Sequence, residues 1–253
     1  YPRLFGHELP FPSIADAFYL GVFPPIVLGL LLLIRQRGGG HAWASLIDSL
    51  IITVGVGLLS WIFLISPYAH DASLSAVTKL TSITYPLMDL LVLSVAVRLS
   101  VGRGARGPSY WFMLGAVCGL FATDSIYAWL LLNGGYSPGG LLDGGWIIFY
   151  LFWGDAALHP SMASAPTGGR TLRLTHRRLL VLAAATFIAP GLTITGHTSE
   201  SDRLVDGGAA IVLFSLVLLR MGGLMRAQEV GSIRGLPPQR ERERKQRLAE
   251  LEL

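Results

Sequence analysis

Charged side chains are scarce in this sequence of 253 residues. Asp, Glu, Lys and Arg together make up 14% of it, whereas soluble globular domains average about 25%. Hydrophobic residues account for 52%, and the mean hydropathy is +0.54. This composition excludes a soluble protein with an ordinary polar surface and is typical of a membrane protein.

Cysteine and histidine are also rare. The one cysteine, Cys118, lies in an apolar run, so no internal disulfide can form, and we interpret it as a small packing residue. A haem held by two imidazoles would need a second histidine at the depth of His159. The other five histidines fall in connections or at helix ends: His7, His41, His70, His176 and His197. We therefore disfavour haem or a metal at His159 and expect no cofactor.

Sequence motifs for nucleotide binding and hydrolysis are missing. The sequence contains no G-x-x-x-x-G-K-[ST], no strand-associated G-x-G-x-x-G, no G-x-S-x-G and no H-E-x-x-H. The glycine-rich strings GGGHAW and GRGARG lie between apolar stretches and are interpreted as turns. No catalytic residue is assigned, and no nucleic acid is expected as a partner.

Seven apolar stretches have about the 20 residues that a spanning helix needs. They predict an all-α, polytopic transmembrane bundle, a domain of residues 13–226 that follows an extracytoplasmic lead-in of residues 1–12. Prolines at 24–25, 86 and 190 are expected to interrupt three of the helices. The stretches are approximately 13–35, 43–66, 77–99, 109–133, 141–163, 178–196 and 203–226.

Basic residues gather on one side of this predicted topology. They follow the first, third, fifth and seventh stretches: Arg35, Arg37, Arg98, Arg103, Arg106, Arg170, Arg173, Arg177, Arg178, Arg220 and Arg226. The opposite side has only Arg3, Lys79 and Arg203. By the positive-inside rule, the N-terminus lies outside and the C-terminus in the cytoplasm.

The last segment, residues 227–253, is polar. Pro237 and Pro238 cannot lie inside a continuous helix, so we expect the seventh helix to stop or bend before them. From about Gln239, Arg and Glu alternate at helical spacings, which indicates a solvated cytoplasmic linker helix.

Four acidic residues fall near the ends of the predicted helices. Ser13 and Asp16 have the S-x-x-D spacing of a capping box, in which an acid meets free N–H groups and the positive end of the helix dipole. Asp143 and Asp206, near outer ends, and Asp48, near the inner end of the second helix, are interpreted in the same way as helix-end acids.

Three further acids, Asp89, Asp124 and Asp155, are predicted to lie deep within helices, where an ionised carboxylate costs about 2.5 to 3.5 kcal/mol. His159 follows Asp155 by four residues and would share its helical face. These four residues form the candidate intramembrane polar site. Aromatic residues of stretch 141–163 would wall a pocket beside it, chiefly Trp146, Tyr150 and Trp153.

Three interpretations of the deep acids stay open. They could form a proton or cation path, or a pocket for a small ligand walled by the aromatic residues. They could also be interhelical hydrogen-bonding groups without further function. Their expected partners would then be nearby hydroxyl residues: Ser82, Thr84, Tyr85, Thr123, Ser125 and Tyr127.

Five ordered strings resemble the multi-pass membrane region that precedes GGDEF and EAL output domains in bacterial cyclic-di-GMP signalling proteins. They are PFPSIADAFYLGVFPP, LIDSLIITVGVGLLSWIFLISPY, ITYPLMDLLVLSVAVRL, DSIYAWLLLNGGY and DGGWIIFYLFWGDAALHPSM, and the resemblance covers roughly residues 9–226. The resemblance implies an input and anchoring region followed by a linker, which RERERKQRLAELEL resembles. This chain has neither a GGDEF nor an EAL motif.

The resemblance and the deep acids together predict a sensory and anchoring module in the bacterial inner membrane. We expect it to form a homodimer through the membrane domain and the C-terminal helix, and to bind an unknown small ligand. Because the sequence starts at Tyr1, we expect a processed chain or part of a longer protein. The alternatives are a transporter or channel that uses the aspartates, and an accessory structural subunit of a membrane complex.

Overall fold

A computed structural model describes residues 11–36, 42–101, 107–163, 176–195 and 202–235, which are mostly helical and contain no strand. The predicted all-α class is thereby confirmed. The elements are α2 (Ile14–Gly21), α3 (Phe23–Gln36), α4 (Ala42–Ser60), the π-helix η1 (Trp61–Ile65), α5 (Ser66–His70), α6 (Ala76–Val101), α7 (Pro108–Leu132), α8 (Asp143–Leu158), the 3₁₀ helix η2 (Pro160–Met162), α9 (His176–Thr195) and α10 (Asp202–Gly235).

Five helical stretches in the described part of the chain are long and apolar enough to cross a membrane, judged by length and composition. They are Ile14–Gln36, Trp43–His70, Ala76–Ser100, Pro108–Leu132 and Asp202–Arg226. The other two predicted stretches are also helical but shorter: α8 has 16 residues, and the apolar part of α9 is Leu180–Ile194. These helices are those of a membrane protein.

Proline explains two irregularities in the spanning helices. The first span breaks at Val22, where α2 ends and α3 begins with Pro24 and Pro25 in its first turn. The π-helix η1 precedes Pro67, which has no N–H to donate to a carbonyl of the preceding turn. Pro86 and Pro190 instead lie inside continuous helices, α6 and α9.

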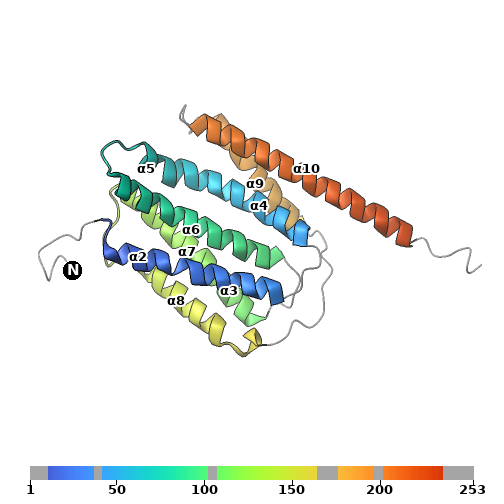
Figure 1. Cartoon of the computed structure of the whole chain (residues 1–253), viewed down its shortest axis with the longest axis horizontal. Helices are drawn as coiled ribbons and strands as arrows, with labels where there is room; N and C mark the ends of the chain where they lie inside the picture. The colour runs from blue at the N-terminus through green and yellow to red at the C-terminus, as the bar shows by residue number, and fades with distance from the viewer. Residues whose placement is uncertain (1–10, 37–41, 102–106, 164–175, 196–201, 236–253) are drawn as a thin grey trace, which may run out of the picture.

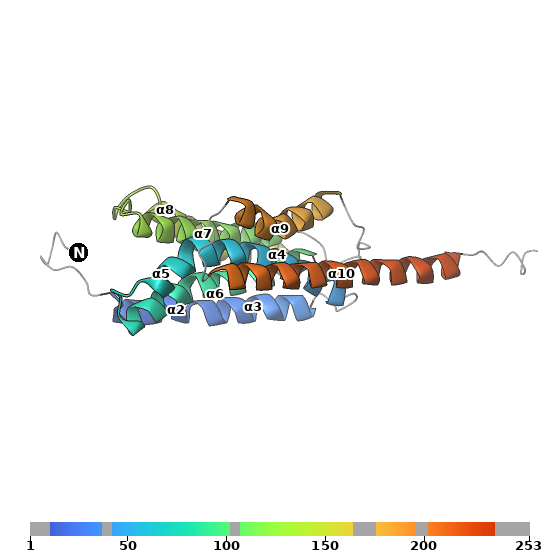
Figure 2. The same ribbon diagram turned by 90° about the horizontal axis from the view of Figure 1, so that it is seen from above.

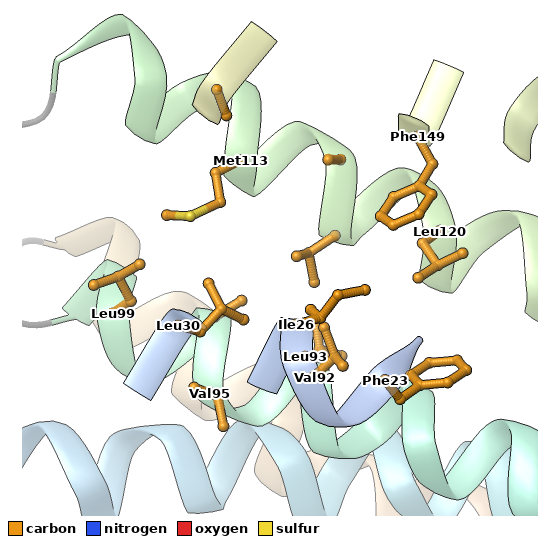
Figure 3. Packing of buried hydrophobic residues seen from close by; sticks show 14 of the residues in the cluster. Phe23, Ile26, Leu30, Val92, Leu93, Val95, Leu99, Met113, Leu120 and Phe149 are labelled. Carbon is orange, nitrogen blue, oxygen red and sulfur yellow. The ribbon is translucent and has the colours of Figure 1, made fainter. Parts of the chain in front are cut away.

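One half of the bundle is built around α6, which packs against α3, α4 and α7, while α8 packs against α7 (Figure 1). Phe23, Ile26 and Leu30 repeat at helical spacing along α3, so one face of this helix is apolar. Figure 3 shows that face lying against α6 and α7. The buried partners labelled there are Val92, Leu93, Val95 and Leu99 from α6, Met113 and Leu120 from α7, and Phe149 from α8.

A second buried cluster joins α4, α9 and α10, with Ile51, Ala185 and Leu213 among its members. Helices α4 and α9 approach closely at Gly55, where an added Cβ would lie 2.8 Å from the carbonyl oxygen of Ala185. Small residues at such crossings let backbones meet in the absence of a hydrophobic driving force between helices in lipid.

Helix α10 is the longest element, with 34 residues, or about 51 Å at 1.5 Å per residue. It begins beside α5, runs along α4 and α9, and continues beyond the end of the bundle (Figures 1 and 2). The helix continues past the apolar stretch that ends near 226, through polar residues to Gly235, so its described part ends before Pro237 and Pro238, as expected. The expected linker helix from Gln239 lies outside the described residues.

Candidate functional site

A pocket of about 430 Å³ lies between α2, α3, η1, α5, α6, α7 and α8, near the end of the bundle where α2 begins. Its lining combines three acids with many aromatic residues. The acids are Asp16, Asp89 and Asp124, and the aromatic residues are Phe11, Tyr19, Phe23, Tyr68, Tyr85, Tyr127, Tyr136, Trp146, Phe149 and Tyr150.

Helical spacing accounts for the two central walls. Ser82, Tyr85 and Asp89 follow one another at three and four residues along α6, so they share one face. On α7, Asp124 and Tyr127 are three residues apart and share a face in the same way. The pocket forms where these two faces meet.

Asp89 of α6 and Asp124 of α7 are neighbours in the lining of the pocket. Trp146 of α8 donates its indole N–H to Asp124 Oδ1 at 2.6 Å. The carboxyl groups of Asp89 and Asp124 lie close enough to each other to interact. The structure thus brings together two of the three deep acids predicted from the sequence.

Asp89 also carries an atom without a partner. Its side chain is only 4% exposed, and its Oδ1 is buried with no hydrogen-bond donor among the described residues. A buried polar atom left unpaired is costly, and such atoms are uncommon in native structures. Because Asp89 lines the pocket, the residue with this unpaired acceptor belongs to the pocket wall.

Asp16 has two roles, of which the sequence predicted one. The capping box is confirmed, with the Ser13 backbone N–H donating to Asp16 Oδ2 at 2.7 Å. The other carboxylate oxygen, Oδ1, accepts the hydroxyl of Tyr85 at 2.8 Å. Interpreting Asp16 as a cap alone was therefore incomplete, because this contact also ties α2 to α6 at the pocket.

Asp155 and His159 do not join the pocket. Helix α8 ends at Leu158 rather than at 163, so Asp155 lies in its last turn, with an exposed side chain. Asp155 is nine residues after Trp146, about 14 Å further along the helix. The backbone of His159 is extended, so it does not continue the helical face of Asp155, and its Nδ1 accepts the Ser161 N–H at 3.1 Å.

Two of the three aromatic residues predicted to wall the pocket line it in the structure. Trp146 and Tyr150 line the pocket, while Trp153 does not and instead lies against Phe149, with 6.0 Å between ring centroids. Tyr127 contacts the rings of both Trp146 and Tyr136 edge-on, at 5.5 and 4.7 Å.

The remaining acids near helix ends differ in their contacts. Asp143 is the first residue of α8 and accepts hydrogen bonds from the Tyr136 hydroxyl and the Gly139 N–H. Asp206 accepts the Thr193 hydroxyl at 2.5 Å. Asp48 does not cap a helix end as interpreted: it is fully buried within α4 and pairs with Arg220 of α10, Oδ1 to Nε 2.6 Å.

Among the pocket tyrosines, Tyr85, Tyr127 and Tyr150 were expected near the deep acids, whereas Tyr19, Tyr68 and Tyr136 were not predicted from the sequence. Tyr68, Tyr85 and Tyr136 line the site from α5, α6 and the α7–α8 connection. Tyr85 lies four residues before Asp89, and that spacing was the available signal. Tyr68 and Tyr136 reach the pocket only through the packing of elements that are distant in sequence.

Three of the hydroxyl residues expected to bond the deep acids have other partners. Thr84 and Thr123 donate to carbonyl oxygens of their own helices, those of Leu80 and Gly119. The hydroxyl of Tyr85 goes to Asp16. The interhelical contact that Asp124 does make comes from Trp146, an aromatic residue of the predicted pocket wall.

Comparisons with known proteins give no relative: no family model, no curated protein and no solved structure matches this chain. Any statement about function therefore depends on the geometry of the site and on the sequence itself.

Proposed function

We propose that this chain is a membrane-embedded sensory and anchoring module of a bacterial signalling protein, and that the pocket is its ligand-binding site. The observation that carries this proposal is Asp89, which lines a cavity of about 430 Å³ and whose buried Oδ1 has no hydrogen-bond donor among the described residues. Ligand sites are typically largely apolar cavities of this size with a few polar groups that fix orientation.

The route from the pocket to the output is proposed to run through three helices. Asp89 is on α6, α6 packs against α4, and α4 packs against α10. The ion pair of Asp48 and Arg220 ties α10 to α4. Because α10 extends past the bundle, a small shift of α6 and α4 would move its far end. The resemblance to input regions of cyclic-di-GMP proteins supports this direction of signalling.

The test is a chimera of residues 1–253 joined to a diguanylate cyclase domain and expressed in bacteria. Asp89→Asn is expected to change cyclic-di-GMP production severalfold, because it alters the only carboxylate of the pocket known to present an unpaired oxygen among the described residues. Asp155→Asn is the matched control, since it makes the same chemical change at an exposed position away from the pocket. Equal output from all three proteins would contradict the proposal.

The proposed orientation places the pocket end outside and α10's far end in the cytoplasm, with seven membrane-associated helices in the inner membrane. Arg35 and Arg98 lie in the last turns of α3 and α6, which supports this orientation by the positive-inside rule. Ser137→Cys, in a Cys118→Ser background, should react with an impermeant maleimide in intact spheroplasts, whereas Arg226→Cys should react only after lysis. The reverse pattern would invert the topology.

A homodimer through the membrane domain and the C-terminal helix is part of the proposal. Met225, an exposed residue on α10, is a suitable reporter position. In a Cys118→Ser background, Met225→Cys should form an intermolecular disulfide in membranes under mild oxidation. Exclusively monomeric protein under these conditions would contradict dimerisation through this face.

A transporter or channel is the second candidate, favoured by the pairing of Asp89 and Asp124 inside the membrane part. Reconstituted vesicles separate the two proposals. Ion or solute flux that Asp89→Asn abolishes would replace the sensory proposal, and its absence would leave the sensory proposal in place.

A further inference from the structure

The lining of the pocket has one sign of charge. Its ionisable residues other than tyrosine are Asp16, Asp89 and Asp124, and no lysine, arginine or histidine occurs among the described residues that line it. Buried acids in proteins are usually paired with cations or coordinate metals. Here the protein itself provides hydrogen-bond donors but no positive charge.

The hydrogen bonds of the three acids leave one buried carboxylate oxygen without a donor among the described residues, and a positive charge would fit beside that carboxylate. Asp16 uses both carboxylate oxygens, for Ser13 and for Tyr85. Asp124 receives Trp146 and contacts Asp89. Asp89 Oδ1 has no donor, although the side chain is only 4% exposed. A cation seated in the cavity beside Asp89 would pair with this oxygen.

The size and walls of the cavity favour an organic cation over a bare ion. About 430 Å³ is the space of many water molecules, each of which occupies about 30 Å³ of the liquid. Most of the lining is aromatic or aliphatic, and it does not offer the shell of oxygen ligands that a hard inorganic cation needs.

The aromatic residues supply a second attraction for positive charge. The faces of tyrosine and tryptophan rings attract cations, and cages of such rings recognise quaternary ammonium groups. Tyr127 contacts both Trp146 and Tyr136 edge-on at the pocket. Edge-on packing holds these rings in fixed orientations around the space beside Asp124.

From these observations we infer that the pocket binds a small organic cation, a protonated amine or a quaternary ammonium with an apolar body. Its charge lies beside Asp89 and Asp124, and its apolar part lies against the aromatic walls. This assignment rests on the proposed ligand-binding role of the pocket, and it adds the chemical class of the ligand.

The experiment uses the whole chain in lipid nanodiscs and three probes. Benzyltrimethylammonium tests for a cation with an apolar body, and choline is compared with its neutral carbon isostere, 3,3-dimethylbutan-1-ol. Binding is followed by tryptophan fluorescence, because Trp146 lines the pocket, and by isothermal titration calorimetry. We expect saturable binding of benzyltrimethylammonium and at least about tenfold weaker binding of the neutral isostere than of choline, which corresponds to about 1.4 kcal/mol.

Variants locate the binding. Asp89→Asn should weaken benzyltrimethylammonium binding at least about tenfold, and Trp146→Phe, which keeps an aromatic ring but removes the donor to Asp124, should weaken it less. Asp155→Asn, exposed and away from the pocket, should leave the affinity unchanged. Each variant is checked for native helix content and size by circular dichroism and gel filtration, and Trp146→Phe serves if Asp89→Asn fails to fold.

The outcomes separate this inference from the proposed function. Equal binding of choline and 3,3-dimethylbutan-1-ol, unaffected by Asp89→Asn, would overturn the cationic assignment. In that case, a change of cyclic-di-GMP production caused by Asp89→Asn in the chimera would still support the sensory role of the pocket. If sodium or potassium bound at the site and the organic cations did not, the inference that the ligand is organic would be overturned. Absence of binding by every probe at millimolar concentration would overturn the assignment entirely, while a chimera insensitive to Asp89→Asn would overturn the proposed function itself.

Discussion

The acids of the pocket and the acids of the α4–α9–α10 half of the bundle are buried in similar helices but meet different partners. In the second half, Asp48 pairs with Arg220, and Asp202 accepts hydrogen bonds from Trp61 and Ser66. In the pocket, Asp89 and Asp124 meet each other and a cavity. Asp48 and Asp202 are thus matched by groups of the protein, whereas Asp89 in the pocket has an acceptor without a donor among the described residues.

Asp206 is an informative intermediate case. It accepts the hydroxyl of Thr193 and so joins α10 to α9, yet its Oδ1 is buried without a partner among the described residues. It does not line the pocket. An orphan oxygen alone therefore does not define a ligand site; at Asp89 the cavity beside the oxygen makes the difference.

The largest expected effect comes from breaking the matched pair in the second half. Arg220→Ala would remove the guanidinium that pairs with the fully buried carboxylate of Asp48. Loss of one partner of a buried ion pair costs about 3 to 5 kcal/mol. The measurement is denaturant-induced unfolding in detergent micelles. The double variant Asp48→Leu/Arg220→Met should recover most of the loss, and a single variant as stable as the wild type would show that the pair does not hold α10 in place.

A methyl group added at a close helix contact meets the backbone in one half of the bundle and a side chain in the other. Gly55→Ala would press a Cβ against the backbone oxygen of Ala185, while Gly145→Ala would press one against the side chain of Thr123. Each should lower the free energy of unfolding by about 1 to 3 kcal/mol.

Rescue distinguishes the two glycine variants. Thr123→Ala should restore much of the stability lost in Gly145→Ala, because a side chain can be shortened. Ala185→Gly should restore less in Gly55→Ala, because the carbonyl oxygen stays in place. Equal rescue at both sites would show that the α4–α9 contact is softer than its geometry indicates.

Replacing an acid by a neutral residue should change the stability of the folded protein in opposite directions in the two regions. Asp202→Ala would remove the acceptor of the Trp61 indole N–H and one of the contacts of the Ser66 hydroxyl, at a cost of about 1 to 3 kcal/mol. Asp89→Asn should instead stabilise the protein by about 1 kcal/mol, because sites shaped for ligands often sacrifice stability. Thermal unfolding of both variants without ligand measures the contrast. Destabilisation by Asp89→Asn comparable to that by Asp202→Ala would place Asp89 with the helix-joining acids.

The smallest effect concerns the rim of the pocket, in the connection between α7 and α8. Desolvation, together with the hydrogen bond and charge of Asp143, raises the pKa of Tyr136 to about 12. The folded protein therefore holds the phenol proton more tightly than an unfolded chain, in which tyrosine has a pKa of about 10. The resulting stabilisation is complete below about pH 10 and is lost as the pH rises towards 12.

Phenolate absorbance measures this shift. The difference between the wild type and Tyr136→Phe should titrate near pH 12, and Asp143→Asn should bring the midpoint closer to 10. A midpoint near 10 in the wild type would show that Tyr136 does not donate to Asp143 in solution.

The sequence was sufficient for the helical class and for the position of most helices. Runs of about 20 apolar residues leave the backbone no other way to satisfy its hydrogen bonds in lipid, so the pattern and the structure coincide. Ser13 and Asp16 were predicted as a capping box for a similar reason, since the contact is made between residues three apart in sequence.

Contacts between distant residues were decided only by the tertiary structure. Asp124 meets Trp146 across 22 positions, Asp16 meets Tyr85 across 69 and Asp48 meets Arg220 across 172. Depth along a helix can be read from a hydropathy pattern, but which faces pack together cannot. For this reason three acids of similar apparent depth separated: Asp89 and Asp124 came to line one pocket, and Asp155 came to an exposed last turn, because only the first two lie on helix faces that the packing turns towards each other.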